Sequence, residues 1–172
     1  MAGKLQKEIQ QSQPFALIEE EAILNVIRTA GVLQQATLDF LKDFGLSPVQ
    51  YNVLRILRGA GATGATCSQI GDRLLTRDPD ITRLLDRMES RGLIVRVRSI
   101  EDRRVVIARI SEAGLALVDR IDRPLRELAL SRLGKFGGEA LAELIAGLER
   151  MREAFETTQQ STHQSNQERN IK

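Results

Sequence analysis

The chain has 172 residues, and 42% of them are hydrophobic, which is enough for a buried core and excludes disorder along the whole length. Aromatic residues make up only 3%, too few for a surface of stacked rings that would bind single-stranded nucleic acid. A single cysteine and a single histidine exclude a disulfide framework and a cysteine-based metal cage, so we expect no metal, no cofactor and no catalytic activity.

The total charge of +2 tells little, but its distribution along the chain is uneven. Between Arg83 and Arg109 there are eight arginines against four acidic residues, whereas residues 1–44 hold four basic against six acidic residues. Arginine suits phosphates and base edges better than lysine does. The middle of the chain is therefore the best candidate for a contact with nucleic acid.

The sequence shows no signal peptide and no apolar run long enough to span a membrane. The first ten residues, MAGKLQKEIQ, lack the apolar segment of a signal peptide. No run of about eighteen apolar residues, the length that spans a bilayer, occurs in the sequence. We therefore expect a cytoplasmic protein that does not enter a membrane.

The N-terminal quarter predicts one long helix. Residues 1–13 are polar and rich in glutamine, and we expect them to be loosely ordered. From Phe15 to Phe44, apolar residues recur three or four positions apart, which is the helical period. A helix of this length with a broad apolar face usually packs against more than its own small domain.

Three shorter helices follow, each with a start signal. Residues 47–50 (SPVQ) form a capping box with proline at the first helical position, and the glycine-rich segment 59–65 should end that helix. Residues 66–69 (TCSQ) form a second capping box, which opens a helix to about Leu75. The third helix should begin at Asp78-Pro79.

After Gly92, a candidate left-handed helix cap, the period of the pattern changes to two. Residues 93–98 (LIVRVR) and 105–110 (VVIARI) predict two strands joined by the charged loop 99–104. Because arginine and valine alternate within 95–98, we expect one packed face and one polar face. Three helices followed by such a hairpin predict a winged helix-turn-helix.

The C-terminal third returns to helix. Ser111 is a reasonable N-cap, Pro124 should kink or split the helix that follows, and residues 141–155 predict a last helix before a disordered tail. The terminal apolar stripes exceed what the central module can cover, so they form an intermolecular interface or a closed monomeric bundle. The expected fold is mainly α with a small β-hairpin wing. Its domains are an N-terminal segment and dimerisation helix (1–44), a winged helix-turn-helix (45–110), C-terminal dimerisation helices (111–156) and the tail (157–172).

The segment 77–114 resembles the MarR family of multiple antibiotic resistance regulators. That family combines a recognition helix, then Gly-Leu-(Ile/Val), a strand with arginine, an Asp-Arg-Arg wing tip and a capped return helix. Here the tip is Asp102-Arg103-Arg104, and the order of elements matches over roughly residues 15–156. A DRR tripeptide alone would carry no information, so its place after a recognition-like helix is what matters.

Helix geometry and the resemblance together give the expected DNA contacts. The start of a recognition helix meets base edges and phosphates in the major groove, where Asp80 would accept from cytosine or orient a neighbouring arginine. The resemblance implies that Arg104 enters a minor groove, that Asp102 pairs with it and holds its side chain, and that Arg103 faces the DNA backbone. The complete set of expected DNA-binding residues is Ser68, Gln69, Arg77, Asp80, Thr82, Arg83, Asp102, Arg103 and Arg104.

The same resemblance implies a homodimeric transcriptional regulator of pseudo-palindromic double-stranded DNA, most simply a repressor released by a ligand. A small aromatic or lipophilic effector would bind in a pocket bordered by the helices around residues 30–55 and 111–121. The order of elements and the wing motif favour this over the plain alternative that the arginines form solvated surface pairs, for example Asp86 with Arg83.

Two other functions remain open. Cys67 opens a helix, where a thiol can become reactive, so the regulator could sense oxidants instead of a ligand. A small buried cysteine is the commoner case. A winged helix can also serve as a protein-interaction module that binds no DNA.

Overall fold

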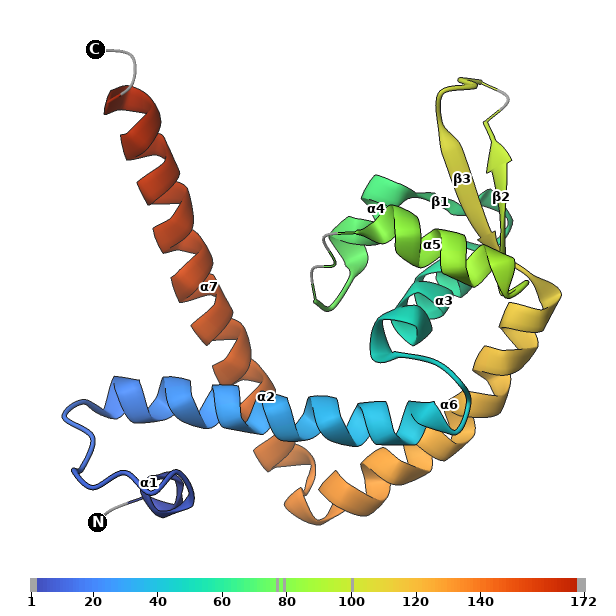
Figure 1. Cartoon of the computed structure of the whole chain (residues 1–172). Helices are drawn as coiled ribbons and strands as arrows, with labels where there is room; N and C mark the ends of the chain where they lie inside the picture. Colours follow the sequence, from blue (N-terminus) through green and yellow to red (C-terminus); the bar gives the residue numbers. More distant parts are fainter. Residues whose placement is uncertain (1–2, 77, 79, 100, 170–172) are drawn as a thin grey trace. The chain divides into compact units, whose positions relative to one another are not determined.

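The computed structural model describes residues 3–76, 78, 80–99 and 101–169, with side chains as far as residue 157. The chain divides into two compact units, Met1–Asp122 and Arg123–Lys172, and each is considered by itself. No helix in these described ranges is both long and apolar enough to cross a bilayer. The helices in chain order are α1 (Lys4–Glu8), α2 (Ile18–Lys42), α3 (Pro48–Ala60), α4 (Cys67–Arg73), α5 (Ile81–Ser90), α6 (Glu112–Leu133) and α7 (Gly138–Arg169) (Figure 1).

Both predicted capping boxes are present and set where α3 and α4 begin. The Ser47 hydroxyl accepts the backbone N–H of Gln50 at 3.2 Å, and the Gln50 side chain accepts the backbone N–H of Ser47 at 3.0 Å. Thr66 and Gln69 make the same reciprocal pair at 3.3 and 2.9 Å. Each box satisfies two N–H groups that a helix start leaves without intrahelical partners.

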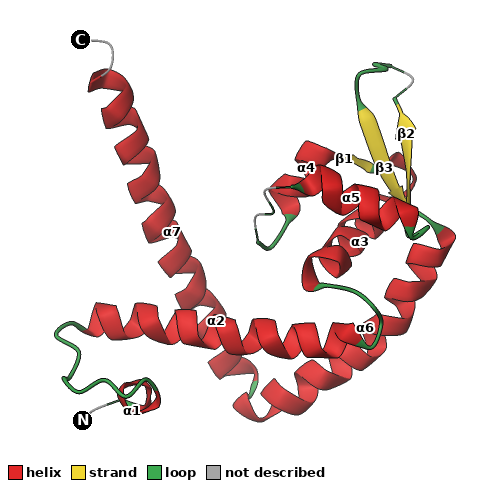
Figure 2. Ribbon diagram, in the orientation of Figure 1, coloured by secondary structure: helices red, strands yellow, loops and turns green. Residues whose placement is uncertain are grey.

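The hairpin forms as predicted and acquires one more short strand. β2 (Ile94–Arg98) pairs antiparallel with β3 (Val106–Ile110), and β1 (Ala65–Thr66) pairs with the other edge of β3, giving the order β1-β3-β2 (Figure 2). The expected burial of the valine face is wrong, because Val95 and Val97 are 47% and 38% exposed. Arg96 is instead half-buried, because it pairs with acidic residues of α5.

The core of the first unit is apolar and joins α3, α4 and α5 to the sheet and to the first half of α6. Since buried apolar side chains supply most of the stabilisation of such a small module, these helices form one packed body. The largest fully buried side chains are Leu41, Val53, Leu54, Leu57, Ile70, Leu84, Leu85, Met88, Ile94, Val118 and Ile121.

Ser111 joins the end of the α5 region to the start of α6. Its hydroxyl donates to the carbonyl of Gly92 at 2.6 Å and accepts the backbone N–H of Gly114 at 3.0 Å. The carbonyl of Leu93 accepts the backbone N–H of Ser111 at 3.1 Å. Gly114 is buried, and a Cβ atom there would clash with this Leu93 carbonyl oxygen. The absence of a side chain at residue 114 is what lets α6 approach the hairpin so closely.

Four local expectations are corrected by the structure. Residues 4–8 form α1 with Leu5 buried, because Leu5 gives this polar segment an apolar side chain to pack. α5 begins after Asp80, whose side chain caps it, instead of at Asp78; Pro79 lies outside the described residues. Of the two outcomes expected at Pro124, a split is wrong, because α6 runs through the proline as one helix. α7 continues to Arg169, beyond the end expected at residue 156. The four domain boundaries given above remain predictions.

We predict that Gly114→Ala destabilises the fold by about 1–3 kcal/mol or more, because the added methyl group meets a backbone carbonyl that cannot rotate away. Gly59→Ala is the matched control, since residue 59 is also helical and a Cβ there meets nothing within 4 Å. It should raise stability by up to about 1 kcal/mol. Urea unfolding of both variants measures the difference, and equal midpoints would contradict the close approach.

Candidate nucleic-acid interface

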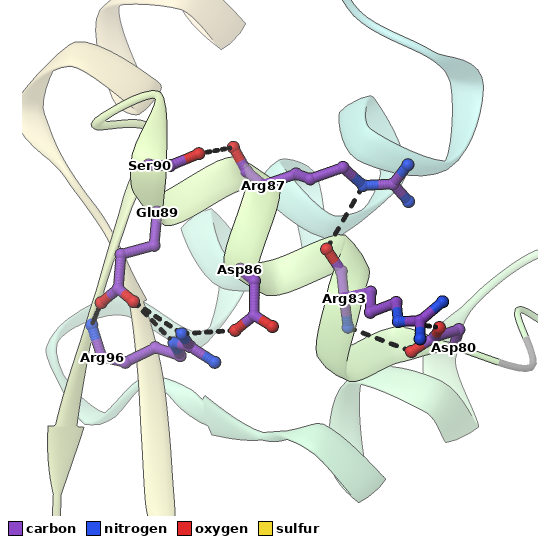
Figure 3. A network of polar contacts seen from close by, with 7 residues as sticks. All are labelled: Asp80, Arg83, Asp86, Arg87, Glu89, Ser90 and Arg96. Atoms are coloured by element: carbon purple, nitrogen blue, oxygen red, sulfur yellow. Dashed lines mark hydrogen bonds and ion pairs between the residues drawn. The ribbon is translucent and has the colours of Figure 1, made fainter.

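The start of α5 presents Arg83 in a fixed position. Asp80 Oδ1 accepts the backbone N–H of Arg83 at 3.1 Å, and Asp80 Oδ2 lies 3.2 Å from Arg83 Nε (Figure 3). The carboxylate thus caps the helix and holds the arginine of the first turn. The Arg83 side chain is 82% exposed and Thr82 is exposed beside it. Asp80 thus contacts the neighbouring arginine, as one of its two expected roles requires, and its contact with cytosine stays a prediction.

Arg96 of β2 connects the hairpin to α5. Its Nε and Nη2 donate to Glu89 Oε2 at 2.9 and 2.7 Å, and its backbone N–H donates to Glu89 Oε1 at 2.9 Å (Figure 3). Nη2 also lies 2.6 Å from Asp86 Oδ1. Asp86 and Glu89 therefore pair with the neighbouring strand. The alternative raised from the sequence, a surface pair of Asp86 with Arg83 along α5, is not what Asp86 forms. We call Asp86, Glu89 and Arg96 the wing clamp.

Charge and hydrogen bonding reinforce each other in the wing clamp. The hydrogen bond from the Arg96 guanidinium is the main cause that holds the pKa of Glu89 below its ordinary value, against the opposing effect of burial. The same bond is the main cause that raises the pKa of Arg96. Both residues are consequently charged at neutral pH, and charge-assisted bonds of this kind are stronger than neutral ones.

Short polar contacts also order the wing tip between β2 and β3. The Ser99 hydroxyl accepts the backbone N–H groups of Glu101 and Asp102 at 3.2 and 3.4 Å. Asp102 Oδ1 accepts the backbone N–H of Arg104 at 2.9 Å, and the Asp102 carbonyl accepts the N–H of Val105 at 2.9 Å. Asp102 thus shapes the turn through the backbone of Arg104 and not through its guanidinium.

The predicted site residues fall into three places. Thr82 and Arg83 lie with Asp80 at the start of α5, and Asp102, Arg103 and Arg104 are exposed at the wing tip. Ser68 and Gln69 are exposed in the first turn of α4, where the Gln69 side chain is occupied by its capping box. Arg77 lies outside the described residues.

The wing clamp and a second polar cluster, which lies between α3 and α6, were not predicted from the sequence. Arg58 Nη1 lies 2.8 Å from Asp122 Oδ2 and 3.1 Å from Asp119 Oδ1, and the Tyr51 hydroxyl donates to Asp122 Oδ1 at 3.0 Å. Burial first, and then the bond to Asp122, raise the pKa of Tyr51. Asp119 and Asp122 are three residues apart, which puts both carboxylates on one face of α6. This spacing was the signal in the sequence from which the cluster could have been predicted.

A pocket of about 570 Å³ lies within the first unit, in the size range of small-molecule sites. It is bordered by α2 and α3, as expected, and by the connection from α4 to α5 in place of the expected residues 111–121. Cys67 is half-buried at the start of α4 and is not part of its lining. The lining residues are Gly31, Leu33, Gln34, Gln35, Thr37, Leu38, Pro48, Val49, Asn52, Leu75 and Thr76.

Comparisons with known proteins agree with this architecture. A sequence profile of the MarR family matches residues 44–105. The chain is similar to the HTH-type transcriptional regulator MhqR of Bacillus subtilis, with 38% identity over 77 residues that cover 45% of this chain and 52% of MhqR. The match covers 52% of the length of MhqR and 57% of the length of a second Bacillus subtilis relative, the uncharacterized HTH-type regulator YkoM. The chain thus spans little more than half of each.

Solved structures extend the likeness to most of the chain. The crystal structure of a MarR transcription factor from Planctomyces limnophilus has 39% sequence identity and a TM-score of 0.61, and the match covers 78% of this chain and 98% of that one. The S. aureus MepR–DNA complex matches with 22% identity and a TM-score of 0.68, covering 76% of this chain and 96% of that one. At that lower identity the likeness concerns the fold.

We predict that Glu89→Gln lowers stability at pH 7 and that the deficit shrinks under acid. Because the pKa of Glu89 is lowered in the folded protein, its contribution is complete above about pH 4.3, the ordinary glutamate pKa, and is lost as the pH falls through the folded value. Urea midpoints at pH 7, 5 and 3.5 measure the gap between variant and parent. Glu143→Gln, an exposed glutamate of α7, is the control. A gap that stays constant with pH would contradict the wing clamp.

Proposed function

The chain belongs to the MarR family, and from this premise we propose that it is a cytoplasmic, homodimeric regulator of transcription that binds double-stranded DNA. We propose further that it acts as a repressor that a small molecule releases. The observation that carries the proposal is the wing clamp, because it fixes the hairpin to α5 so that both present their exposed arginines from one rigid scaffold.

α5 is the proposed recognition helix. Its apolar face is buried through Leu84, Leu85 and Met88, so its polar face is left to approach a major groove. Arg83 can donate to guanine or to a phosphate, and Thr82 can contact a phosphate or a thymine methyl group. Ser68 and Gln69 of α4 are proposed phosphate contacts, and Arg77 is a proposed contact from outside the described residues.

The wing tip is the proposed second contact. Arg104 would enter a narrow minor groove, whose negative potential favours an inserted arginine, and Arg103 would bind the DNA backbone. The bonds from Ser99 and Asp102 to the backbone of the loop support this, since an ordered loop loses less conformational entropy when it binds.

A homodimer would cover apolar side chains that a single chain leaves exposed in both units. Contiguous exposed apolar surface commonly marks a protein–protein interface. Two recognition helices would then meet half-sites about one helical turn of DNA apart. The exposed apolar side chains include Ile18, Ile23, Ile27, Val32, Leu33 and Leu38 of α2 and Leu144, Ile145 and Phe155 of α7.

We expect Arg104→Ala to lower the affinity for the DNA upstream of its own gene by roughly tenfold to a hundredfold, with the fold unchanged, because an arginine–DNA contact contributes roughly 1–3 kcal/mol. The slope of log affinity against log salt should also fall in magnitude by about 0.9 if the contact is to phosphate. Arg120→Ala, an exposed arginine of α6, is the matched control. Fluorescence anisotropy measures both, and an unchanged affinity for Arg104→Ala would favour a protein-interaction module instead.

Ile27→Asp should convert the dimer into a monomer, because it would bury an unpaired carboxylate in the proposed interface. Ile27 is 61% exposed in the single chain, so the substitution spares the core. Ala62→Asp is the control, since residue 62 is exposed in the segment after α3 and lies outside the helices proposed to form the interface. Sedimentation velocity gives the masses. A parent protein that sediments as a monomer contradicts the dimer outright.

A further inference from the structure

The turn of α6 before Pro124 lacks one bond that an unbroken helix has. Proline carries no N–H, so the carbonyl of Arg120, four residues earlier, loses its usual helical partner. Proline is also a main cause of sharp bends in helices. Although α6 runs on to Leu133 as one helix, residues 120–124 are therefore the place where it bends most easily.

Burial fixes α6 only as far as this turn. Val118 and Ile121 are fully buried in the core of the first unit, and that unit ends at Asp122. Residues 123–133 all lie within the described part of the chain, and none of them is buried. The direction of the second half of α6 therefore depends on the geometry of residues 120–124 and on the contacts that hold them.

Two side chains of α3 hold this turn. Arg58 Nη1 lies 2.8 Å from Asp122 Oδ2 and 3.1 Å from Asp119 Oδ1, so a single nitrogen joins two residues of α6 that are three positions apart. The Tyr51 hydroxyl donates to the other oxygen of Asp122, Oδ1, at 3.0 Å. Both oxygens of Asp122 are thus held by α3. We call Tyr51, Arg58, Asp119 and Asp122 the α6 clamp.

The α6 clamp is built on a fixed side chain. Tyr51 is only 6% exposed, so the close-packed core fixes its ring and with it the position of its hydroxyl. The side chains of Arg58 and Asp122 are 30% and 23% exposed, and partly buried charges are screened by salt less than exposed ones. Loss of the Arg58 guanidinium would therefore remove a strong partner from a partly buried carboxylate.

We propose that Arg58 is a positioning residue for DNA binding. It holds the turn that Pro124 weakens, and so sets the direction in which the second half of α6 leaves the module. The effect on DNA rests on the proposed function, because only in a homodimer does this direction set the separation of two recognition helices. The hold on the turn belongs to the single chain and is independent of DNA.

Hydrogen exchange of the full chain without DNA tests the hold on the turn. Arg58→Gln should raise the exchange rates of the amides of residues 121–128 by roughly tenfold, because local opening becomes easier, and leave those of α5 unchanged. Arg55→Gln is the matched control, since Arg55 is an exposed arginine of α3 whose guanidinium lies over the Tyr51 ring, 5.9 Å from its centroid. Unchanged exchange at residues 121–128 in Arg58→Gln overturns the proposal.

A second substitution separates positioning from a general stabilising role. Pro124→Ala gives residue 124 an N–H again, so the helix no longer needs Arg58 to keep its direction. The double variant Arg58→Gln/Pro124→Ala should therefore exchange like the parent at residues 121–128. A residue that only stabilised the module would not be rescued by this change. Exchange in the double variant that stays as fast as in Arg58→Gln contradicts the role assigned to the turn.

The consequence for DNA is tested on half-sites whose spacing is changed. The probes are the DNA upstream of the protein's own gene, with the half-sites that footprinting identifies, and two copies with one base pair added or removed between them. Because one base pair rotates a half-site by about a tenth of a turn, the parent should prefer the original spacing roughly tenfold. Arg58→Gln should show a preference of about threefold or less, since a freer α6 fits several spacings less selectively, and the double variant should regain the preference.

Fluorescence anisotropy measures these affinities, with Arg55→Gln again as the control. A spacing preference in Arg58→Gln equal to that of the parent overturns the positioning role, even if exchange at the turn is faster. If the parent binds no DNA or sediments as a monomer, the proposed function fails, while exchange and rescue still decide whether Arg58 holds the turn. If the parent binds DNA but Arg58→Gln exchanges like the parent, the inference about Arg58 fails alone.

Discussion

Arg96 is placed where one strand of a hairpin meets the last turns of a helix, and two carboxylates of that helix share its guanidinium. Isolated surface ion pairs contribute little, because both side chains must be ordered and water screens the charges. Here the Arg96 side chain is only 23% exposed, and the backbone of Arg96 joins the same carboxylate that its side chain contacts. One glutamate therefore fixes both the strand and the side chain, so the hairpin cannot swing independently of α5.

The arrangement of the candidate interface follows from that constraint. Arg83 is held by Asp80 at one end of α5, and the wing clamp holds the hairpin nearer the other end. Two elements that reach different grooves must keep a set separation, since DNA presents its grooves at fixed spacing. The polar contacts within the wing tip have the same effect on Arg103 and Arg104, because they hold the backbone that carries these arginines.

Local signals in the sequence were sufficient for the element order and for the helix starts at Ser47 and Thr66, because capping boxes and a change of period act within a few residues. They were insufficient where a partner lies across the fold. In the sequence, Asp86 and Glu89 are spaced to pair with arginines of their own helix. They pair with Arg96 instead, because the fold places β2 beside α5. The pocket was foreseen on α2 and α3. Its third wall depended on where an irregular connection lies, which periodicity does not predict.

Ser111 and Gly114 leave no flexible linker between the hairpin region and α6. One hydroxyl bridges the carbonyl after α5 and the first turn of α6, while the missing side chain at residue 114 lets the helix backbone touch the carbonyl of Leu93. A flexible loop could change conformation when α6 rotates, whereas the direct contacts of Ser111 and Gly114 with Gly92 and Leu93 leave no such freedom. A rotation of the first half of α6 would therefore also move the C-terminal end of α5, because Ser111 and Gly114 join the two rigidly.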